Sequence, residues 1–338
     1  MGKLNIKKIS EMAGVSTTAV SFVLNNKKGV SEETRKKILD IIERENYTPN
    51  VNSRRLILKR SFNIFLVLDN DISKLENLFY SAIINGIVGK AYKLGYSVVL
   101  SLKEGSFEKS PLLQAIKQNN ADGVIFLQDI DNETMYELNK IKIPYVVIDS
   151  QKANPEYVSV KSDYELSSYV STKYLIECGH KKIAFIGMSK VPDFYITSFN
   201  GYKRAISEHS LSFYPDWIQG DAYDDVSAYN CMKNILSSNE IPTAVFCAGD
   251  ILAIGAMNCA HDMGYKIPYD ISFSSIDNIA AAEYCRPKLT TIDIDKVGMG
   301  EKAIELLDAQ INNCLSEKVY VVKSDKIIVR DSVRNLNE

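Results

Sequence analysis

The sequence predicts a small all-α helix-turn-helix domain followed by an α/β body of two doubly wound parallel-sheet subdomains. Three observations support this fold class. Two short helical patterns meet at the turn Ala13-Gly14-Val15. Positive charge is concentrated around them, since residues 1–60 hold 13 Lys/Arg and 6 Asp/Glu, whereas the other 278 residues hold 27 and 36. From residue 61 onward, short apolar runs alternate with amphipathic helical stretches.

Length and composition favour a multidomain protein without membrane segments. At 338 residues and 46% hydrophobic content, the chain can bury more than one core. The first ten residues are polar, so we expect no secretory signal peptide, and the longest clean apolar runs, such as 64–68, are too short to span a membrane. Six scattered cysteines without a C-x-x-C pair predict reduced thiols in a cytoplasmic protein, with neither disulfides nor a zinc site.

The first 49 residues are expected to form three short helices around a small core. Asn5 can cap the first helix, Gly14 permits the turn after it, and Ser16 can cap a second helix that runs to about Asn25. The third helix begins at Ser31, with two acidic residues in its first turn, where the helix dipole favours them. Helical spacing assigns an apolar set to the core: Ile6, Ile9, Met12, Val20, Val23, Leu24, Ile38, Ile42 and Tyr47.

Short polar side chains occupy the opposite face of the second helix. Such side chains can approach base edges closely, and a Gly-containing turn joins this helix to the first. Together with the positive charge, this pattern predicts a helix-turn-helix domain whose second helix enters the major groove. The alternative is an ordinary three-helix bundle with a solvated polar face. The polar set consists of Thr17, Thr18, Ser21 and Asn25.

The body is predicted to hold parallel sheets with helices on both faces, because continuous apolar strands separated by helices are typical of them. The number of such runs indicates two doubly wound subdomains. The expected strands are 63–69, 97–102, 123–127, 145–149, 182–187, 243–248 and 271–276. The expected helices are 77–94, 108–119, 163–178, 198–209, 225–237, 250–263 and 295–313.

Two features typical of enzymes have simpler explanations. The stretch from Gly298 to Ala303 matches the dinucleotide-binding pattern G-x-G-x-x-A, but its glycines fall inside an expected helix and no βαβ unit surrounds it. His180, His209 and His261 have no nucleophile pattern nearby, and His180 follows a helix-capping glycine at an expected exposed turn. The sequence therefore predicts no catalytic site, no cofactor and no enzyme.

The chain resembles the lactose-repressor family of regulators along most of its length. The matching segments are AGVSTTAVSFVLN, GVSEETRKKIL, YTPN, LIECGHKKIAFIG, GYKRAI, PTAVFCAGDILAIGA, SIDNIA and RPKLTTIDID. The resemblance implies a helix-turn-helix domain over 1–49, a hinge helix over 50–60 and an effector-binding and dimerisation domain over 61–338 with a periplasmic-binding-protein fold. Its N-subdomain would span about 61–161 and 292–323, and its C-subdomain about 162–291 and 324–338. A ligand cleft would lie between them.

The resemblance also implies that the hinge helix contacts DNA in the minor groove. Leu56 would wedge between base pairs there and kink the duplex, while basic neighbours would meet phosphates. The alternative is a basic linker without that role. The hinge residues expected at DNA are Asn50, Ser53, Arg54, Arg55 and Leu56.

Phe22 departs from the family pattern, which usually has Arg at this position. An Arg can make a bidentate contact with guanine, and Phe cannot donate hydrogen bonds. The ring can either pack back onto the domain or touch a thymine methyl group, and both interpretations stay open. The family's usual operator sequence is therefore not carried over to this chain.

By the same resemblance, Phe79 and Tyr80 would flank a ligand in the cleft, and Asp277 would accept hydrogen bonds from it. Ser198 and Gly249 stand where sugar-responsive members carry Arg and Asn, which removes a guanidinium fork and an amide. We therefore expect neutral sugars to bind weakly, and a less hydroxylated or cationic ligand, or a protein partner, to act instead. The alternative for the aromatic pair is ordinary core. The expected cleft residues are Phe79, Tyr80, Asp149, Ser198, Gly249 and Asp277.

The leading interpretation is a homodimeric transcriptional regulator, a repressor of a catabolic operon. It would bind a pseudo-palindromic double-stranded DNA operator and respond to a small-molecule effector in the cleft. A second interpretation replaces the small molecule by a partner phosphocarrier protein, as in the family's catabolite-control members. A third, from a different class, is a small-molecule binding protein or enzyme whose basic head is incidental.

Overall fold

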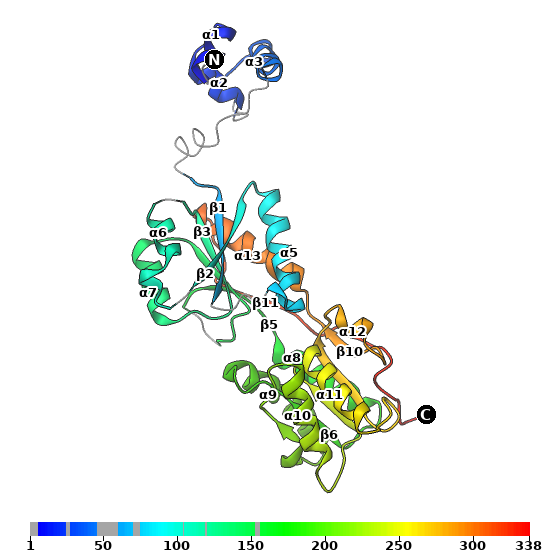
Figure 1. Cartoon of the computed structure of the whole chain (residues 1–338). Coiled ribbons are helices and arrows are strands. Elements are labelled where there is room, and N and C mark those ends of the chain that lie inside the picture. The colour runs from blue at the N-terminus through cyan, green and yellow to red at the C-terminus, as the bar shows by residue number, and fades with distance from the viewer. Residues whose placement is uncertain are drawn as a thin grey trace. The chain divides into compact units, whose positions relative to one another are not determined.

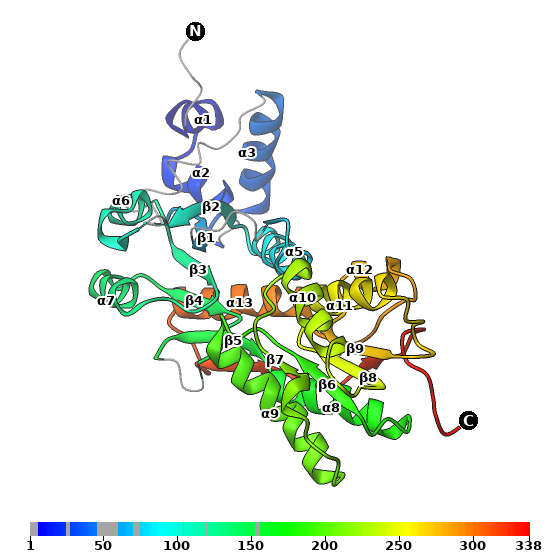
Figure 2. The same cartoon turned by 60° about the horizontal axis from the view of Figure 1, so that its bottom comes forward.

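The computed structural model describes residues 6–24, 28–45, 60–69, 75–103, 105–118, 120–152 and 156–338. The chain divides into two compact units, Met1–Phe62 and Asn63–Glu338. We refer to them as the head and the body. Figure 1 shows the helices of the head and the two sheets of the body, and Figure 2 shows the same elements from a second direction.

The head contains the three expected helices, α1 Ile6–Ala13, α2 Thr17–Leu24 and α3 Glu32–Arg44. The side chain of Ser31 caps α3 by accepting a hydrogen bond from the backbone N–H of Thr34 at 3.3 Å. Of the predicted core, Met12 is 38% exposed, and Ile6, Leu24 and Ile42 are half-buried and pack against the buried residues. Tyr47 lies outside the described residues. Ala13, which follows Met12, and Ile41, which precedes Ile42, are buried, since they continue the stripes that begin at Ile9 and Ile38.

The first subdomain of the body is built on a six-stranded sheet in the order β11-β5-β4-β3-β1-β2, and all its strand pairs are parallel. Its helices are α5 Leu78–Lys93, α6 Pro111–Lys117, α7 Asn132–Ile141 and α13 Lys296–Ile311. The strands are β1 Asn63–Asp69, β2 Ser97–Lys103, β3 Gly123–Leu127, β4 Tyr145–Ile148, β5 Val158–Ser162 and β11 Val319–Val322.

Alternation along β1 distributes side chains to two helix layers. Ile64, Leu66 and Leu68 pack on the side of α5 and α13, whereas Phe65 and Val67 pack on the side of α6 and α7. Both faces are thus covered, as the continuous apolar runs predict. Figure 1 shows α13 (orange) beside α5 (cyan) on the first of these faces.

The second subdomain has another six-stranded sheet in the order β12-β10-β9-β8-β6-β7, parallel except for the β10–β12 pair. Helices α8 Tyr164–Glu177 and α9 Pro192–Glu208 pack on one face, and α10 Asp225–Leu236 and α11 Asp250–Asp262 on the other. The short α12 is Ala281–Tyr284. The strands are β6 Ile183–Ile186, β7 Ile218–Gln219, β8 Ala244–Cys247, β9 Ser272–Asp277, β10 Thr290–Asp293 and β12 Ile327–Ile328.

Three connections join the two sheets: β5 to α8, β10 to α13, and β11 to β12. The predicted doubly wound architecture is confirmed, but α9 begins six residues earlier than expected, at Pro192. Helix α7 and the short strands β5, β7, β11 and β12 were not anticipated, because brief polar-mixed segments carry little periodic signal.

The glycines of the G-x-G-x-x-A stretch have a packing role. A Cβ at Gly300 would lie 2.1 Å from the carbonyl oxygen of Ile83, and a Cβ at Gly86 would lie 2.1 Å from that of Val297. Helices α5 and α13 therefore cross backbone to backbone at these two glycines. The stretch lies inside α13, as expected, and its small residues serve helix contact.

His180 corrects another expectation. Instead of lying at an exposed turn, its side chain is 1% exposed. Its ring nitrogens contact Thr243 Oγ1 at 3.1 Å and the carbonyl oxygen of Arg334 at 3.0 Å. Burial lowers the pKa of this histidine, so it is neutral near pH 7 and acts as a structural link between the sheet and the C-terminal segment.

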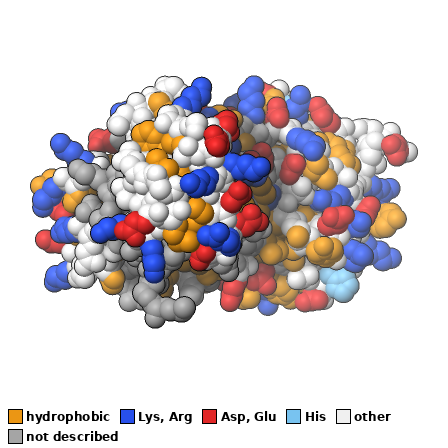
Figure 3. Space-filling model, turned by 90° about the horizontal axis from the view of Figure 1, so that it is seen from above, with side chains coloured by type: hydrophobic (Ala, Val, Ile, Leu, Met, Phe, Trp, Pro, Cys, Tyr) orange, Lys and Arg blue, Asp and Glu red, His pale blue; other side chains and the backbone are white. Residues whose placement is uncertain are grey.

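The outer surface is mixed in character. In Figure 3 basic and acidic side chains lie side by side over the face shown, between scattered hydrophobic patches, as on ordinary globular proteins. Among the described helices, none is long and apolar enough to cross a membrane.

Candidate effector pocket and DNA-contacting helix

A pocket of about 150 Å³ lies in the body where the two subdomains face each other. Its walls come from the carboxyl ends of β3, β4, β8 and β9 and from the first turns of α5, α8, α9 and α11. Ligands of open α/β sheets bind at such strand ends. The lining residues are Asn77, Phe79, Tyr80, Gln128, Asp149, Gln151, Tyr164, Met188, Val191, Phe194, Tyr223, Ala248, Gly249, Ile251, Leu252, Asp277 and Ile279.

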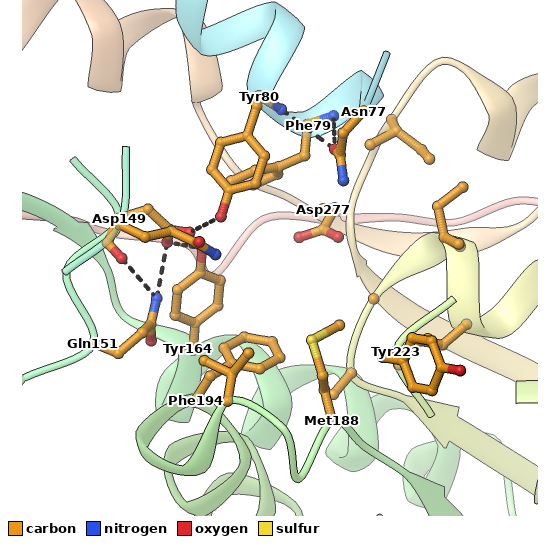
Figure 4. A pocket seen from close by; sticks show the side chains of 17 residues that line it. Asn77, Phe79, Tyr80, Asp149, Gln151, Tyr164, Met188, Phe194, Tyr223 and Asp277 are labelled. Atoms are coloured by element: carbon orange, nitrogen blue, oxygen red, sulfur yellow. Dashed lines mark hydrogen bonds between the residues drawn. The ribbon is translucent and has the colours of Figure 1, made fainter. Parts of the chain in front are cut away.

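Asp149 is the acceptor of a hydrogen-bond network on one side of the pocket (Figure 4). Its carboxylate accepts bonds from the hydroxyl of Tyr80 at 2.8 Å, the hydroxyl of Tyr164 at 2.7 Å and the side-chain amide of Gln151 at 2.9 Å. Burial, followed by the nearby charge of Asp149, raises the pKa of both phenols well above the ordinary value. Both tyrosines therefore stay protonated and act as donors.

Asp250 lies at the start of α11, beneath the pocket, and is fully buried. Its carboxylate accepts hydrogen bonds from Ser275 Oγ at 2.5 Å, Thr291 Oγ1 at 2.6 Å and the backbone N–H of Ile279 at 2.7 Å. Burial raises its pKa to about 6 against the opposing effect of these bonds. Asp250 thus joins the start of α11 to β9, β10 and the residues after β9.

Asp277 is the second acid that lines the pocket, and Figure 4 shows its carboxylate directed into the cavity. Burial, then repulsion from Asp250 and Asp149, raises its pKa well above the ordinary carboxyl value, while Lys296 acts in the opposite direction. The ionised form of Asp277 is therefore disfavoured unless a positive group comes close to it.

The loop after β9 is held in an unusual backbone conformation. Asp277 and Asn278 have φ angles of 115° and 51°, in the left-handed region that non-glycine residues rarely adopt. The Lys296 ammonium donates to the carbonyl oxygens of Asp277, Asn278 and Ile294. Arg330 and Asp293 bind the Asn278 side chain at 2.7 Å and 2.9 Å. These bonds fix the direction of the Asp277 carboxylate.

Five of the six predicted cleft residues line the pocket: Phe79, Tyr80, Asp149, Gly249 and Asp277. Ser198 does not. It is fully buried inside α9, and its hydroxyl donates to the carbonyl oxygen of Phe194 one turn earlier at 2.8 Å. A short side chain in this helix cannot reach the cavity, which Phe194 lines instead. Gly249 has a φ of 148°, a conformation suited to glycine.

Several lining residues were missed by sequence reasoning. Gln128 and Gln151 follow β3 and β4, so a polar residue just after an apolar run was the signal that could have found them. Tyr164 and Phe194 lie in the first turns of α8 and α9, where helical periodicity alone makes them look like core. Asn77 caps α5 by accepting a bond from the N–H of Phe79 at 2.9 Å.

On the head, the structure places the predicted DNA-reading side chains on α2. Thr17 and Thr18 are exposed, and Ser21 and Phe22 are half-buried. A Cβ built at Gly29, whose φ is 115°, would lie 3.1 Å from the Phe22 ring. The ring thus rests against the Gly29 backbone, which favours packing onto the domain. Asn25, Asn50, Ser53, Arg54, Arg55 and Leu56 lie outside the described residues.

Within the ranges that the structure describes, no group of three or more His, Cys, Asp or Glu side chains could hold a metal ion.

The fold and the site define a class: a DNA-binding head on a two-subdomain ligand-binding body. Comparison with known proteins agrees. Residues 5–50 match the model for bacterial regulatory proteins of the lacI family, and residues 172–333 match a periplasmic binding protein-like domain.

Among relatives, the HTH-type transcriptional repressor PurR of Pasteurella multocida is 31% identical over 98% of both chains. PurR of Histophilus somni is 32% identical over 98% of this chain and 99% of that one. The lac repressor dimer bound to operator and the anti-inducer ONPF superimposes with a TM-score of 0.81 at 22% identity, covering 98% of this chain and 100% of that one. The protein belongs to the lacI family of bacterial regulatory proteins, and it is a DNA-binding transcriptional repressor.

Proposed function

We propose that the protein is a homodimeric repressor whose affinity for a pseudo-palindromic operator is set by a small molecule bound in the body pocket. One observation carries this proposal: the pocket takes its walls from both subdomains, and Tyr164 of the second bonds to Asp149 of the first across it. A ligand that fills the pocket contacts both subdomains, so it favours one relative arrangement over another.

Exposed apolar side chains on the first subdomain support a second copy as the partner. β2 is an edge strand, and its Leu100 and Leu102 are 52% and 40% exposed. Val88 and Leu94, on α5 and at its end, add exposed apolar surface close to β2. An edge strand with such side chains is a hazard for an isolated monomer and a suitable surface for a symmetric interface.

Solved structures of similar fold support a small molecule over a phosphocarrier protein as the modulator. A LacI-family regulator from Enterococcus faecium, determined with bound ribose, has a TM-score of 0.70 at 25% identity, covering 81% of this chain and 99% of that one. The pocket of this chain is suited to a ligand of that size class. The control of a catabolic operon remains a prediction.

The test is an operator-binding assay with a ligand panel. Genome-wide footprinting identifies the sites, and fluorescence anisotropy then measures the affinity of the full chain for one of them, with and without each compound that raises its melting temperature. We expect at least one such compound to change operator affinity, and Phe194→Ala to abolish the change. Asp216→Asn, at an exposed residue outside the pocket, is the control. If every compound that binds the body leaves operator affinity unchanged, the proposed control is wrong.

A further inference from the structure

We propose that the effector is a small organic cation with a flat apolar body, held between Asp149 and Asp277 and enclosed by aromatic rings. The inference rests on the proposed function, because it names the chemical class of the ligand for the same pocket. It follows from the charge, the shape and the wall chemistry of the described lining.

The charge of the lining has one sign. Two carboxylates line the cavity, and the described lining residues include no lysine, arginine or histidine. The nearby Lys296 donates its ammonium hydrogen bonds to three backbone carbonyl oxygens and not to the carboxylates of Asp149 or Asp277. The ammonium of Lys190 lies on the Tyr223 ring, 3.2 Å from its centroid, at the rim. A positively charged ligand would pair with an ionised carboxylate for which the described lining offers no cation.

The walls favour a flat cation over a hydrated one. Phe79, Tyr80, Tyr164 and Phe194 face the cavity, with the Tyr164 and Phe194 rings edge to face at 4.8 Å. Aromatic faces attract organic cations, most strongly where water is excluded. A cavity of about 150 Å³ accommodates a molecule of the size of a single ring. The pocket is therefore of the right size for one ring bearing a charged group.

Hydrogen bonding assigns different roles to the two acids. Asp149 already accepts three bonds from the protein, so it contributes fixed negative charge. The Asp277 carboxylate accepts a hydrogen bond from the backbone of Asp250, no side-chain donor to it is seen within the described part of the chain, and it is directed into the cavity. Asp277 is thus the acid positioned to bind the ligand's N–H groups.

Binding a cation would also release a proton. Burial and the acidic neighbours Asp250 and Asp149 raise the pKa of Asp277, so its carboxyl holds a proton more readily than a free carboxyl does. The ligand cation pairs with the carboxylate, and the displaced proton leaves to solvent, so net charge is conserved. Affinity for a cation should therefore rise with pH. The charged and titratable groups around Asp277 are Asp149, Asp250, Lys296, Tyr80, Tyr164, Asp293 and Arg330.

The experiment compares three probes of nearly the same shape: benzamidine (cation), benzamide (neutral) and benzoate (anion). Isothermal titration calorimetry with the full chain at pH 6 and pH 8 gives the affinities of the three probes. We expect benzamidine to bind about tenfold more tightly than benzamide at pH 8, and benzoate to bind most weakly. The preference for benzamidine should shrink at pH 6, and titration in buffers of different ionisation enthalpy should reveal proton release.

Two variants test whether Asp277 causes the preference for benzamidine. Asp277→Asn keeps the shape, and Asn tolerates positive φ, so the fold should persist while the preference for benzamidine and its pH dependence are lost. Asp216→Asn, on the exposed surface, should leave both unchanged. Because burial and its acidic neighbours disfavour the ionised form of Asp277, Asp277→Asn should also raise the melting temperature of the unliganded protein above that of the parent at pH 8.

The outcomes separate this inference from the proposed function. If benzamide or benzoate binds as tightly as benzamidine, if none of the three binds, or if Asp277→Asn keeps the preference, the ligand class is wrong. Should an uncharged sugar shift operator affinity through this pocket, the repressor function stands and the cation is excluded. If benzamidine binds as expected and no pocket ligand changes operator affinity, the ligand class stands and the proposed control fails.

Discussion

The hydroxyl of Tyr164 donates a 2.7 Å hydrogen bond to Oδ1 of Asp149. Tyr164 is the first residue of α8 in the second subdomain, and Asp149 follows β4 in the first, so this buried bond joins the two halves of the body at the pocket. Oδ2 of the same carboxylate accepts from Tyr80. The two subdomains thus share one acceptor, and a ligand beside it competes with or reinforces that link.

Tyr164→Phe should destabilise the body by about 1.5–3 kcal/mol, because it removes a buried hydrogen bond to a charged acceptor. The control is Tyr202→Phe, which removes an equally buried bond to the carbonyl oxygen of Ile183 within one subdomain. A bond to an uncharged acceptor contributes about 0.5–1.5 kcal/mol. Urea unfolding of the full chain measures both variants. Equal losses, or a smaller loss in Tyr164→Phe, would contradict the role assigned to the Asp149 link.

The buried carboxyl of Asp250 should make stability depend on pH. Burial raises its folded-state pKa to about 6, above the ordinary value, so the folded protein binds more protons than the unfolded chain between about pH 4 and 6. The contribution of Asp250 to the free energy of unfolding therefore falls as pH rises through this window, by on the order of 3 kcal/mol.

Other carboxyls titrate in the same range, so the parent must be compared with Asp250→Asn. Urea unfolding at pH 4, 5, 6 and 7 gives the difference in unfolding free energy between the two proteins. We expect the free energy of unfolding of the parent to fall relative to that of the variant as pH rises from 4 to 6, with little change above pH 6. If the free energy of unfolding of the parent stays constant or rises relative to that of the variant over this pH range, Asp250 ionises normally.

Phe22→Arg should create a base preference that the parent lacks. The Phe22 ring rests on Gly29, and a phenyl ring cannot donate hydrogen bonds to a base edge. An Arg there could contact guanine in bidentate fashion and favour a G·C pair at one position of each half-site by about 1–3 kcal/mol. Selection from randomised site libraries measures this, with Phe22→Leu as the apolar control. If Phe22→Arg selects the same sites as the parent, this position faces away from DNA.

DNA binding should depend strongly on salt. Residues 1–60 carry 13 Lys/Arg and 6 Asp/Glu, so a dimer should neutralise roughly 6–10 phosphates. Affinity should then fall about 10³–10⁵-fold between roughly 50 and 200 mM salt, because counterions are no longer released as favourably. Anisotropy titrations over this range give the slope. A nearly flat response would exclude a phosphate-dominated interface.

Leu56→Ala should reduce DNA bending and the affinity for the specific site, while it leaves non-specific binding almost unchanged. Leu56 lies outside the described residues, and its role as a minor-groove wedge remains a prediction. A shortened side chain would no longer offset the unstacking energy of about a few kcal/mol per base step. Phasing analysis in gel-shift experiments compares the bends, and equal bends in variant and parent would refute the wedge.

The sequence by itself determined the class of each part of this protein. Helical spacing and the turn at Gly14 predict α1 and α2, and the apolar runs predict the main strands of both sheets, because these signals depend on local periodicity. The resemblance carried Phe79, Tyr80, Asp149 and Asp277 to the pocket, since residues at strand ends keep their place when the sheets form.

Only the tertiary structure decided how those residues act together. Ser198, which the resemblance placed at the cleft, lies buried in α9 with its hydroxyl bonded to the carbonyl oxygen of Phe194, and the Phe194 ring lines the cavity. The role of Gly300 became clear only where Ile83 of another helix meets it. Likewise, the raised pKa of Asp277 arises from burial beside Asp250 and Asp149, which lie 27 and 128 positions away in the sequence. Local patterns report periodicity, whereas contact, burial and charge repulsion depend on neighbours that only the folded chain brings together.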